Sequence, residues 1–265
     1  MERCEDGYVF ESGMEGLSLD NVTMRFGGLT AVGELAAVIG PRDLVGLIGP
    51  NGAGKTTVFN VITGVYEPTI GEICFHGERL NGLKPNQISH RGIARTFQNI
   101  RLFHGLTVFD NIRVSLTAQT TFGLFGSMLR SGGFYSNERA LTRKIDELLD
   151  LFHLREVRNE YATSLPYGDQ RRLEIVRALA TNPKLLLLDE PAAGMNLTEK
   201  QSLMRLIQQL REQFKIAILL IEHDMSLVMG ICERILVLDY GLKIAEGTPT
   251  EIRNDPNVIE AYLGV

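Results

Sequence analysis

The chemically most informative stretch of the chain is a glycine-rich loop that reads GPNGAGKT at residues 49–56. It matches the pattern GxxxxGK(S/T) in full, and it lies between the apolar run Leu44–Ile48 and a segment of helical pattern at 55–64. Glycines let backbone N–H groups wrap a phosphate, and the amino end of a helix adds a positive dipole. The spacing predicts a nucleotide-binding loop rather than a glycine turn that only lets a helix pack on a strand. Its predicted binding residues are Gly49, Pro50, Asn51, Gly52, Ala53, Gly54, Lys55, Thr56 and Thr57.

Four polar side chains supply the chemistry that such a loop needs. Lys55 can reach the β- and γ-phosphates of a nucleotide, and the Thr56 hydroxyl can bind Mg²⁺. Asp189 and Glu190 follow the apolar run at 185–188. Asp189 can bind Mg²⁺ through its water shell, and Glu190 can polarise the attacking water. A solvated acidic turn after a core strand is the alternative, but the complete phosphate loop upstream favours the catalytic interpretation.

The elements that must position these residues follow from the apolar pattern. Short apolar runs at 44–48, 185–188 and 216–221 are typical of central parallel strands covered on both faces, and a helical pattern at 205–215 can serve as a crossover. From about 105 to 180 the pattern is mostly helical. The 265 residues therefore suit one α/β domain or a core domain with a small subdomain.

Composition excludes several classes of protein. The chain has 27 Lys and Arg against 32 Asp and Glu, a net charge of −5, which argues against a nucleic-acid binder. No apolar run approaches the roughly 20 residues of a membrane helix, and the N-terminus has no apolar core of a secretory signal. We therefore expect a soluble, cytoplasmic protein.

A family resemblance rests on five ordered motifs. The segment SLPYGDQRRLEI at 164–175 resembles the LSGGQ-type motif of ABC transporter ATPases, and it stands just before the acidic pair, where that family places it. Phe26 is similar to the family's adenine-stacking aromatic, and Gln98 to its Q-loop glutamine. Asn196 matches the D-loop position, and His223 the switch histidine. Each of these single residues has an ordinary structural interpretation, but their order between two strong motifs favours the functional one. The resemblance covers residues 17–265.

The resemblance implies an α/β fold of the P-loop NTPase (ABC ATPase) type. It would have a mostly parallel core sheet, an antiparallel N-terminal β portion and an inserted α-helical subdomain. The implied boundaries are a nucleotide-binding core at 16–98 and 181–247 and a helical subdomain at 99–180. A flexible tail at 1–15 and a C-terminal helical tail at 248–265 would flank them.

The resemblance also assigns roles to residues. Glu190, His223 and Gln98 would be catalytic, ATP would be the nucleotide, and Mg²⁺ would be held by Thr56, Gln98 and Asp189. The LSGGQ-type segment would contact the ATP of a partner subunit, so that two chains enclose two nucleotides. Departures weaken that contact: proline replaces serine, tyrosine replaces glycine, aspartate replaces glutamine, and the D-loop has asparagine instead of aspartate. The segment's predicted contact residues are Leu165, Pro166, Tyr167, Gly168 and Asp169.

Finer details resemble the ATPase subunits of branched-chain amino-acid importers (LivG-type). They are the strings RTFQ at 95–98, DEPAAGMN at 189–196, IEHDM at 221–225 and AYLG at 261–264. This branch implies a peripheral subunit on the cytoplasmic face of a bacterial inner membrane. Its partners would be a second ATPase (LivF-type, or another copy of this chain), two transmembrane permeases and, indirectly, an external substrate-binding protein. No nucleic-acid partner is expected.

Several alternatives stay open at this point. The ATPase does not touch the cargo, so other neutral amino acids, amides, urea or a lipid export function remain, as does a soluble ABC ATPase without a membrane partner. A poorly catalytic assembly module is disfavoured by Glu190 and His223. The phenylalanine- and glycine-rich insertion at 117–136 is expected to fill a small satellite core rather than to contact a partner subunit.

Overall fold

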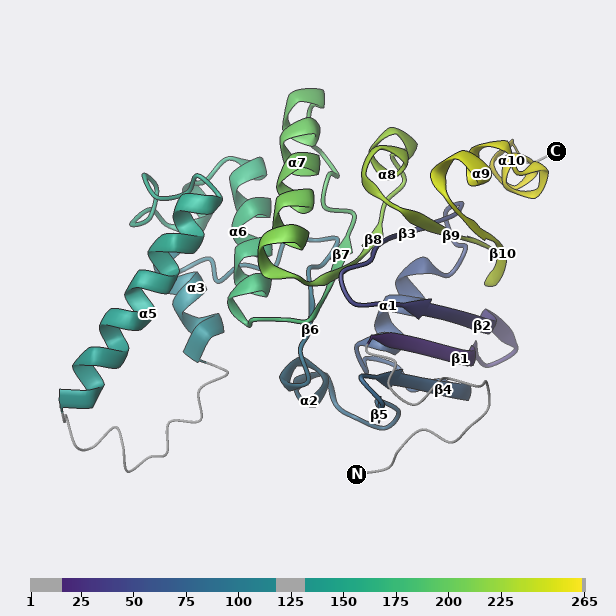
Figure 1. The fold of residues 1–265 in the computed structure, drawn as a ribbon, viewed down its shortest axis with the longest axis horizontal. Coiled ribbons are helices and arrows are strands. Elements are labelled where there is room, and N and C mark those ends of the chain that lie inside the picture. Colours follow the sequence, from purple (N-terminus) through teal and green to yellow (C-terminus); the bar gives the residue numbers. More distant parts are fainter. Residues whose placement is uncertain (1–15, 118–131, 264–265) are drawn as a thin grey trace. The chain divides into compact units, whose positions relative to one another are not determined.

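The computed structural model of the chain describes residues 16–117 and 132–263. Two compact units are present. The core unit contains the described residues up to Arg95 and from Lys184 onward, and the helical unit is Thr96–Pro183. Each unit is described separately below (Figure 1).

The core unit contains two β-sheets. The antiparallel sheet has the order β2-β1-β4-β5, and the larger sheet has the order β10-β9-β3-β8-β7-β6. In the larger sheet all neighbours are parallel except β10, which is antiparallel to β9. The strands are β1 (Leu17–Phe26), β2 (Leu29–Ile39), β3 (Leu44–Ile48), β4 (Ile70–Phe75), β5 (Glu78–Arg79), β6 (Ile93–Arg95), β7 (Leu185–Asp189), β8 (Ala217–Ile221), β9 (Arg234–Asp239) and β10 (Leu242–Gly247).

This arrangement confirms the predicted fold class. Every residue of β3, β7 and β8 is buried, as expected for continuous apolar runs in the middle of a parallel sheet. The third of these strands begins at Ala217, one residue later than the apolar run predicted. The antiparallel N-terminal portion is present as β1, β2, β4 and β5.

One hydrophobic core joins the two sheets. Helix α1 (Lys55–Ile62) contributes Val58, Phe59, Val61 and Ile62 to it, together with alternate residues of the parallel strands and the inner face of the antiparallel sheet. On the other side of the parallel sheet, helix α8 (Met225–Ile231) packs so closely on β3 that a Cβ at Gly46 would lie 2.8 Å from Val228. Both faces of β3 are therefore covered, which holds the end of the strand in place.

The crossover from β7 to β8 is longer than its pattern predicted. Helix α7 spans Leu197–Phe214, whereas the apolar periodicity was visible only from residue 205 onward. Residues 198–202 of the missing part are polar, and a capping box starts the helix: Asn196 accepts a hydrogen bond from the Glu199 amide at 3.0 Å, and Glu199 accepts one from the Asn196 amide at 2.9 Å. A cap rather than an apolar stripe therefore defines this helix start.

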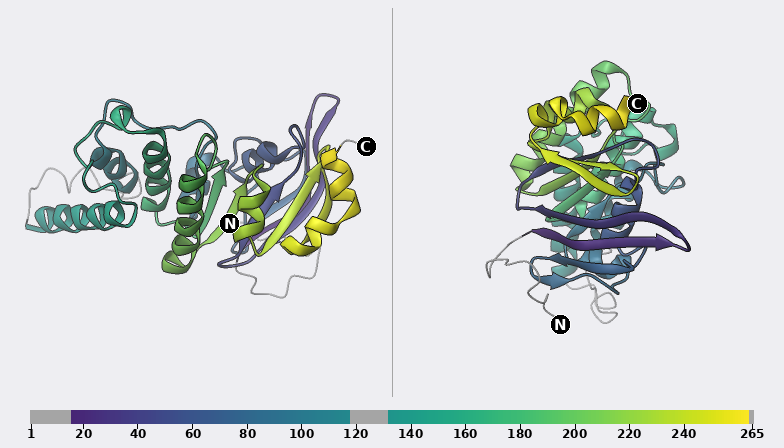
Figure 2. Two further views of the ribbon diagram at one scale, coloured as in Figure 1. Left: turned by 90° about the horizontal axis from the view of Figure 1, so that it is seen from above. Right: turned by 90° about the vertical axis from the view of Figure 1, so that its right-hand side faces the viewer.

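Short helices complete the core unit. Helix α2 (Pro85–His90) precedes β6, and α9 (Pro249–Asn254) and α10 (Pro256–Leu263) lie beside β10 (Figures 1 and 2). Thr248 and Glu251 form a capping box at the start of α9, with proline at the first helical position. The last helix begins at Pro256, because proline is well tolerated in a first helical turn.

The described part of the helical unit contains α3 (Val108–Thr117), α5 (Gly132–Leu151), a short 3₁₀ turn (Ala162–Ser164) and α6 (Tyr167–Ala180). The mostly helical pattern expected from about 105 to 180 is confirmed, and in α5 Ile145, Leu148 and Leu149 form a buried apolar side. The proposed insertion at 117–136 lies mostly outside the described residues, so its role stays a prediction. The same holds for the predicted N-terminal tail at 1–15.

Across the described segments, no helix combines the length and apolar character needed to span a membrane.

Candidate nucleotide-binding and catalytic site

The GPNGAGKT loop connects the carboxyl end of β3 to α1, which begins at Lys55. Two glycines are required by close backbone contacts. Gly49 has a φ of 149°, and a Cβ there would lie 2.0 Å from the Leu238 carbonyl oxygen. Gly54 has a φ of 100°, and its Cβ would lie 2.4 Å from the Ala31 carbonyl oxygen. The loop thus adopts a conformation against its neighbours that other residues would not tolerate.

Lys55 points back into this loop. Its Nζ donates hydrogen bonds to the carbonyl oxygens of Gly49 at 2.7 Å and Pro50 at 2.9 Å, and the residue is 8% exposed. Burial lowers the pKa of the Lys55 ammonium, while the negative charges of Glu190 and Asp189 act in the opposite direction. The cation therefore lies at the centre of the loop and within the field of both acids, as phosphate binding requires.

Asp189 ends β7 with a carboxylate that is almost fully buried. Its Oδ2 accepts a hydrogen bond from Arg95 Nη2 at 2.8 Å, and the two side chains are 3% and 7% exposed. Arg95 also donates to Asn60 Oδ1 at 2.7 Å. Because β6 and β7 are adjacent parallel strands, their carboxyl ends bring Arg95 and Asp189 together. Sequence reasoning missed this arginine, although its place at the end of a strand before Gln98 was a usable signal.

Glu190 and His223 meet at the ends of neighbouring strands. Glu190 Oε2 lies 3.6 Å from His223 Nδ1, and the Glu190 amide donates to the Ile221 carbonyl oxygen at 2.9 Å. Glu190 has a φ of 47°, an unusual conformation for a residue other than glycine and one found repeatedly at functional sites. The Glu190 side chain is 19% exposed and that of His223 is 59% exposed. The acid is thus shielded, and the histidine is open to a ligand.

Glu222 is a buried acid that the sequence analysis passed over. It is 1% exposed, and its carboxylate accepts hydrogen bonds from the backbone amides of Ala192 at 2.8 Å and His223 at 3.2 Å. Burial raises the pKa of Glu222, and the two amide hydrogen bonds partly offset this effect. The residue ties the turn after Glu190 to the turn that carries His223. Its position at the end of a buried strand, directly before His223, was the signal that could have found it.

Phe26 lies at the end of β1 with 41% of its surface exposed. Its ring packs edge to face on Tyr66, with centroids 5.1 Å apart, and Tyr66 is also exposed. Exposed aromatic rings are suited to stacking on a base. Tyr66 was not predicted, because it lies in an irregular segment between α1 and β4.

In the helical unit, the backbone at Gln98 is fixed to α6 by one arginine. Arg171 is fully buried, and it donates to the carbonyl oxygens of Phe97 and Gln98, both at 2.6 Å. It also donates to Glu174 Oε2 at 2.9 Å and to the Tyr167 hydroxyl at 3.1 Å. Burial raises the pKa of Glu174. The charge of Arg171 and the hydrogen bonds that the Glu174 carboxylate accepts lower this pKa. Gln98 and α6 are therefore parts of one hydrogen-bonded cluster.

The LSGGQ-type segment contains the start of a helix. Helix α6 begins at Tyr167, with Pro166 as the residue before it. Proline and a capping geometry suit this start, and the amides of Asp169 and Gln170 both donate to the Pro166 carbonyl oxygen at 3.0 Å. The amides of Tyr167 and Gly168 thus lie in the first helical turn. The Asp169 carboxylate is paired with Arg172 at 3.3 Å.

The predicted site residues divide between the two units. Phe26, the loop at 49–57, the acidic pair, Asn196 and His223 belong to the core unit. There β3, β7 and β8 run parallel, so the loop, the acids and the histidine lie at one edge of the sheet. Asn196 serves as the helix cap described above. Gln98 and residues 165–169 belong to the helical unit.

A phosphate loop after one central strand, with an acidic pair ending another, defines a P-loop nucleotide hydrolase. Comparison with known families places it more narrowly. The family model described as "ABC transporter" matches residues 33–193, and "Branched-chain amino acid ATP-binding cassette transporter" matches residues 243–265. The chain belongs to the ABC transporter family, as an ATP-binding subunit that hydrolyses ATP.

Individual relatives agree with this assignment. The chain is 48% identical to the high-affinity branched-chain amino acid transport ATP-binding protein LivG of Escherichia coli (strain K12), over 94% of this chain and 97% of LivG. It is 44% identical to BraF of Pseudomonas aeruginosa, a protein of the same description, with the same coverage. A crystal structure of the ADP conformation of an ABC transporter ATP-binding cassette superposes with a TM-score of 0.81 at 28% identity, covering 95% of this chain and all of that one.

Proposed function

We propose that the chain powers an ABC importer of branched-chain or other neutral amino acids by hydrolysing ATP at the carboxyl edge of its parallel sheet. The observation that carries the catalytic part is the 3.6 Å approach of Glu190 to His223 beside the Lys55 loop. The cargo and the import direction are supported by the relatives described above and by the family match at 243–265.

ATP binding uses two parts of the core unit. Phe26, with Tyr66 against its edge, offers a stacking face for the adenine. The loop at 49–57 surrounds the phosphates, and α1 directs its amino end at them. Lys55 then exchanges its carbonyl hydrogen bonds to Gly49 and Pro50 for the β- and γ-phosphate oxygens.

The residues at this edge fit a Mg²⁺ ion. Asp189 offers a carboxylate and Thr56 a hydroxyl, both hard oxygen donors, and no cluster of three or more metal-binding side chains exists among the residues described. A site with few protein ligands is typical of Mg²⁺ that is held largely by substrate phosphates and water. Gln98 is the third proposed ligand. Bound there, the ion would neutralise negative charge on the phosphates.

Glu190 and His223 catalyse the hydrolysis in this proposal. Glu190 accepts a hydrogen bond from the attacking water and takes its proton as the oxygen bonds to the γ-phosphorus. The bond between that phosphorus and the β–γ bridging oxygen breaks, which leaves ADP and phosphate. His223 is exposed, so it can hold the γ-phosphate while its Nδ1 faces Glu190. Glu222 anchors the backbone of His223, which makes it a positioning residue.

A partner ATPase supplies the remaining contacts in this proposal. The first turn of α6 presents the amides of Tyr167 and Gly168. They lie at the amino end of the helix, where the positive end of the helix dipole attracts a phosphate. The departures from the family pattern have structural roles here: the Tyr167 hydroxyl supports Arg171, and Asp169 is neutralised by Arg172. The trans contact therefore depends on backbone donors, with residues 165–169 as its segment and Asn196 on the D-loop.

The proposed assembly lies on the cytoplasmic face of the bacterial inner membrane. It contains a second ATPase of LivF type or another copy of this chain and two transmembrane permeases, and an external binding protein delivers the cargo. We also propose that the helical subdomain, expected at 99–180 and present as the unit Thr96–Pro183, carries the motion of the ATPase to the permeases.

The test is a mild-detergent pull-down of the tagged chain from native membranes, followed by mass spectrometry. Two multi-span permeases and a second short ATPase are the expected companions, and uptake assays with leucine, isoleucine and valine then test the cargo. Recovery of ribosomal or DNA-repair proteins, or of no membrane protein, would remove the transport proposal. Recovery of the components of an export system, instead of two permeases and a binding protein, would favour the lipid-export alternative.

A further inference from the structure

A pocket lies in the core unit, at the opposite edge of the parallel sheet from the phosphate loop. It has a volume of about 500 Å³. Residues just before β3, β7 and β8 line it, whereas the loop, the acidic pair and His223 follow the other ends of these strands. Each of the three strands is five residues long, so the two edges are separated by about 15 Å. The pocket is therefore separate from the nucleotide site.

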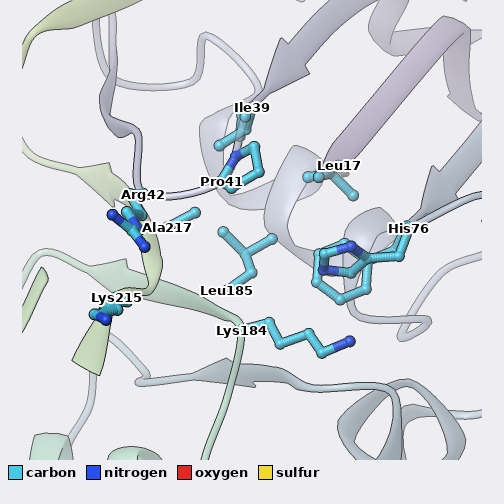
Figure 3. Close-up of a pocket in the computed structure, with 12 residues that line it drawn as sticks. Leu17, Ile39, Pro41, Arg42, His76, Lys184, Leu185, Lys215 and Ala217 are labelled. Carbon is cyan, nitrogen blue, oxygen red and sulfur yellow. The ribbon is translucent and has the colours of Figure 1, made fainter. Parts of the chain in front are cut away.

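Four basic side chains line this pocket. Figure 3 shows Arg42 and Lys215 on one side of it and Lys184 and His76 on the other. Within the described part of the chain, Arg42, Lys184 and Lys215 form no ion pair, although many other basic residues do. The carboxylate of Asp43, next to Arg42 in sequence, is already paired with Arg234 at 3.0 Å. The pocket thus gathers positive charge in a chain whose net charge is −5.

The floor of the pocket is apolar. Leu17, Ile39, Phe75, Leu185 and Ala217 contribute to it, and each is at most 5% exposed. An apolar floor below a cationic rim matches a ligand with an apolar body and negatively charged groups. A purely inorganic anion would leave the floor unused, and a neutral apolar molecule would leave the cations unpaired.

Backbone conformation adds a second observation. Arg42, His76 and Lys215 all have positive φ, at 64°, 50° and 53°. Glycine or asparagine adopts this left-handed conformation at lower cost than a bulky side chain. Lys215 adopts it as the residue that ends helix α7, and Arg42 and His76 adopt it in turns. In each case the side chain at the turn is a basic one that lines the pocket.

We propose that this pocket is a second anion-binding site, which takes a small organic anion with at least two negative charges on an apolar body, such as a phosphate monoester. The cations bind the charged group from both sides, and the apolar residues contact the body. The sites for the anion and for ATP can be filled together, because they lie at opposite edges of the sheet.

The test uses the full chain saturated with ADP, so that the phosphate loop is blocked, and 1-naphthyl phosphate as the probe in calorimetric titrations. The variant Lys184→Gln/Lys215→Gln removes two charges, while the backbone hydrogen bonds of Lys184 to Gly92 and Ala217 remain possible. Arg205→Gln is the matched control, since it removes an exposed charge outside the pocket. Thermal melts establish that both variants fold.

The expected result is saturable binding to the wild type and to Arg205→Gln, and at least tenfold weaker binding to the double variant. Neutral 1-naphthol should bind at least tenfold more weakly than the phosphate. The proposal is overturned if the wild type shows no saturable binding, if the double variant binds equally well, or if 1-naphthol binds as tightly as its phosphate. If the double variant fails to fold, Arg42→Gln replaces it with the same expected direction.

Discussion

Arg171 offers a prediction whose size can be worked out from its contacts. The change is Arg171→Met, which keeps the length of the side chain but removes its charge and its donors. It breaks hydrogen bonds to the carbonyl oxygens of Phe97 and Gln98, to the Tyr167 hydroxyl and to Glu174. Glu174 is then left as a buried carboxylate without its cation, at 5% exposure. Breaking a buried ion pair on one side typically costs about 3–5 kcal/mol, so we expect a loss of that order.

The loss should depend on pH, with a sign fixed by Glu174. Burial already raises the pKa of Glu174, and removal of Arg171 raises it further because the cation lowers it at present. The pKa of such an acid is higher in the folded protein than in the unfolded chain. Its protonation therefore stabilises the folded state at pH values below the unfolded-state pKa, and this stabilisation is lost as the pH rises through the folded-state pKa. The variant should therefore be less impaired at pH 5 than at pH 8, relative to wild type.

Urea unfolding followed by circular dichroism at both pH values measures these differences. Arg172→Met is the matched control: its partner Asp169 is 30% exposed at 3.3 Å, and exposed pairs contribute about 0–1 kcal/mol. If Arg171→Met alone does not fold, Arg171→Met/Glu174→Met should restore folding, since it leaves no unpaired charge. A cost for Arg171→Met below 1 kcal/mol, or equal to that of Arg172→Met, would refute the role assigned to this arginine.

Three further predictions concern the core unit. Lys55→Ala should abolish nucleotide binding in titrations with a fluorescent ATP analogue, because the only cation inside the loop is lost; unchanged affinity would count against the phosphate-loop assignment. Asn196→Ala should lower the free energy of unfolding by about 1 kcal/mol through loss of the α7 cap, and an unaltered urea midpoint would contradict this. Glu222→Gln should destabilise the fold by about 1–3 kcal/mol, because an amide N–H would then face a backbone N–H; equal stability of the variant and wild type would argue that Glu222 is not an anchor.

The fold class was predictable because its central strands are continuous apolar runs of the length that a parallel sheet requires. Residues 44–48 and 185–188 could hardly form anything else next to a phosphate loop. Helix boundaries were less predictable where polar residues begin the helix. The first turn of α7 is polar and is marked by the Asn196 capping box, and α6 starts directly after Pro166 without a side-chain cap.

The candidate site was predictable where local spacing encodes the chemistry, as in the loop and the acidic pair. Contacts between distant segments were not. Arg95 reaches Asp189 only because β6 and β7 pair in parallel, and Arg171 reaches the Gln98 backbone across 73 positions of sequence. The basic pocket gathers residues from separate turns before three strands. Periodicity describes one element at a time, so it carries no information about which turns meet.

The central claim is that Glu190 activates the water that attacks ATP, and one substitution tests it most directly. Glu190→Gln keeps the size and the backbone conformation of the residue but cannot accept a proton. In the assembled complex, the account predicts ATP binding close to that of wild type, together with a loss of turnover of at least about 100-fold, the size typical of a missing general base. Retention of a substantial fraction of wild-type ATP hydrolysis, with binding intact, would contradict it.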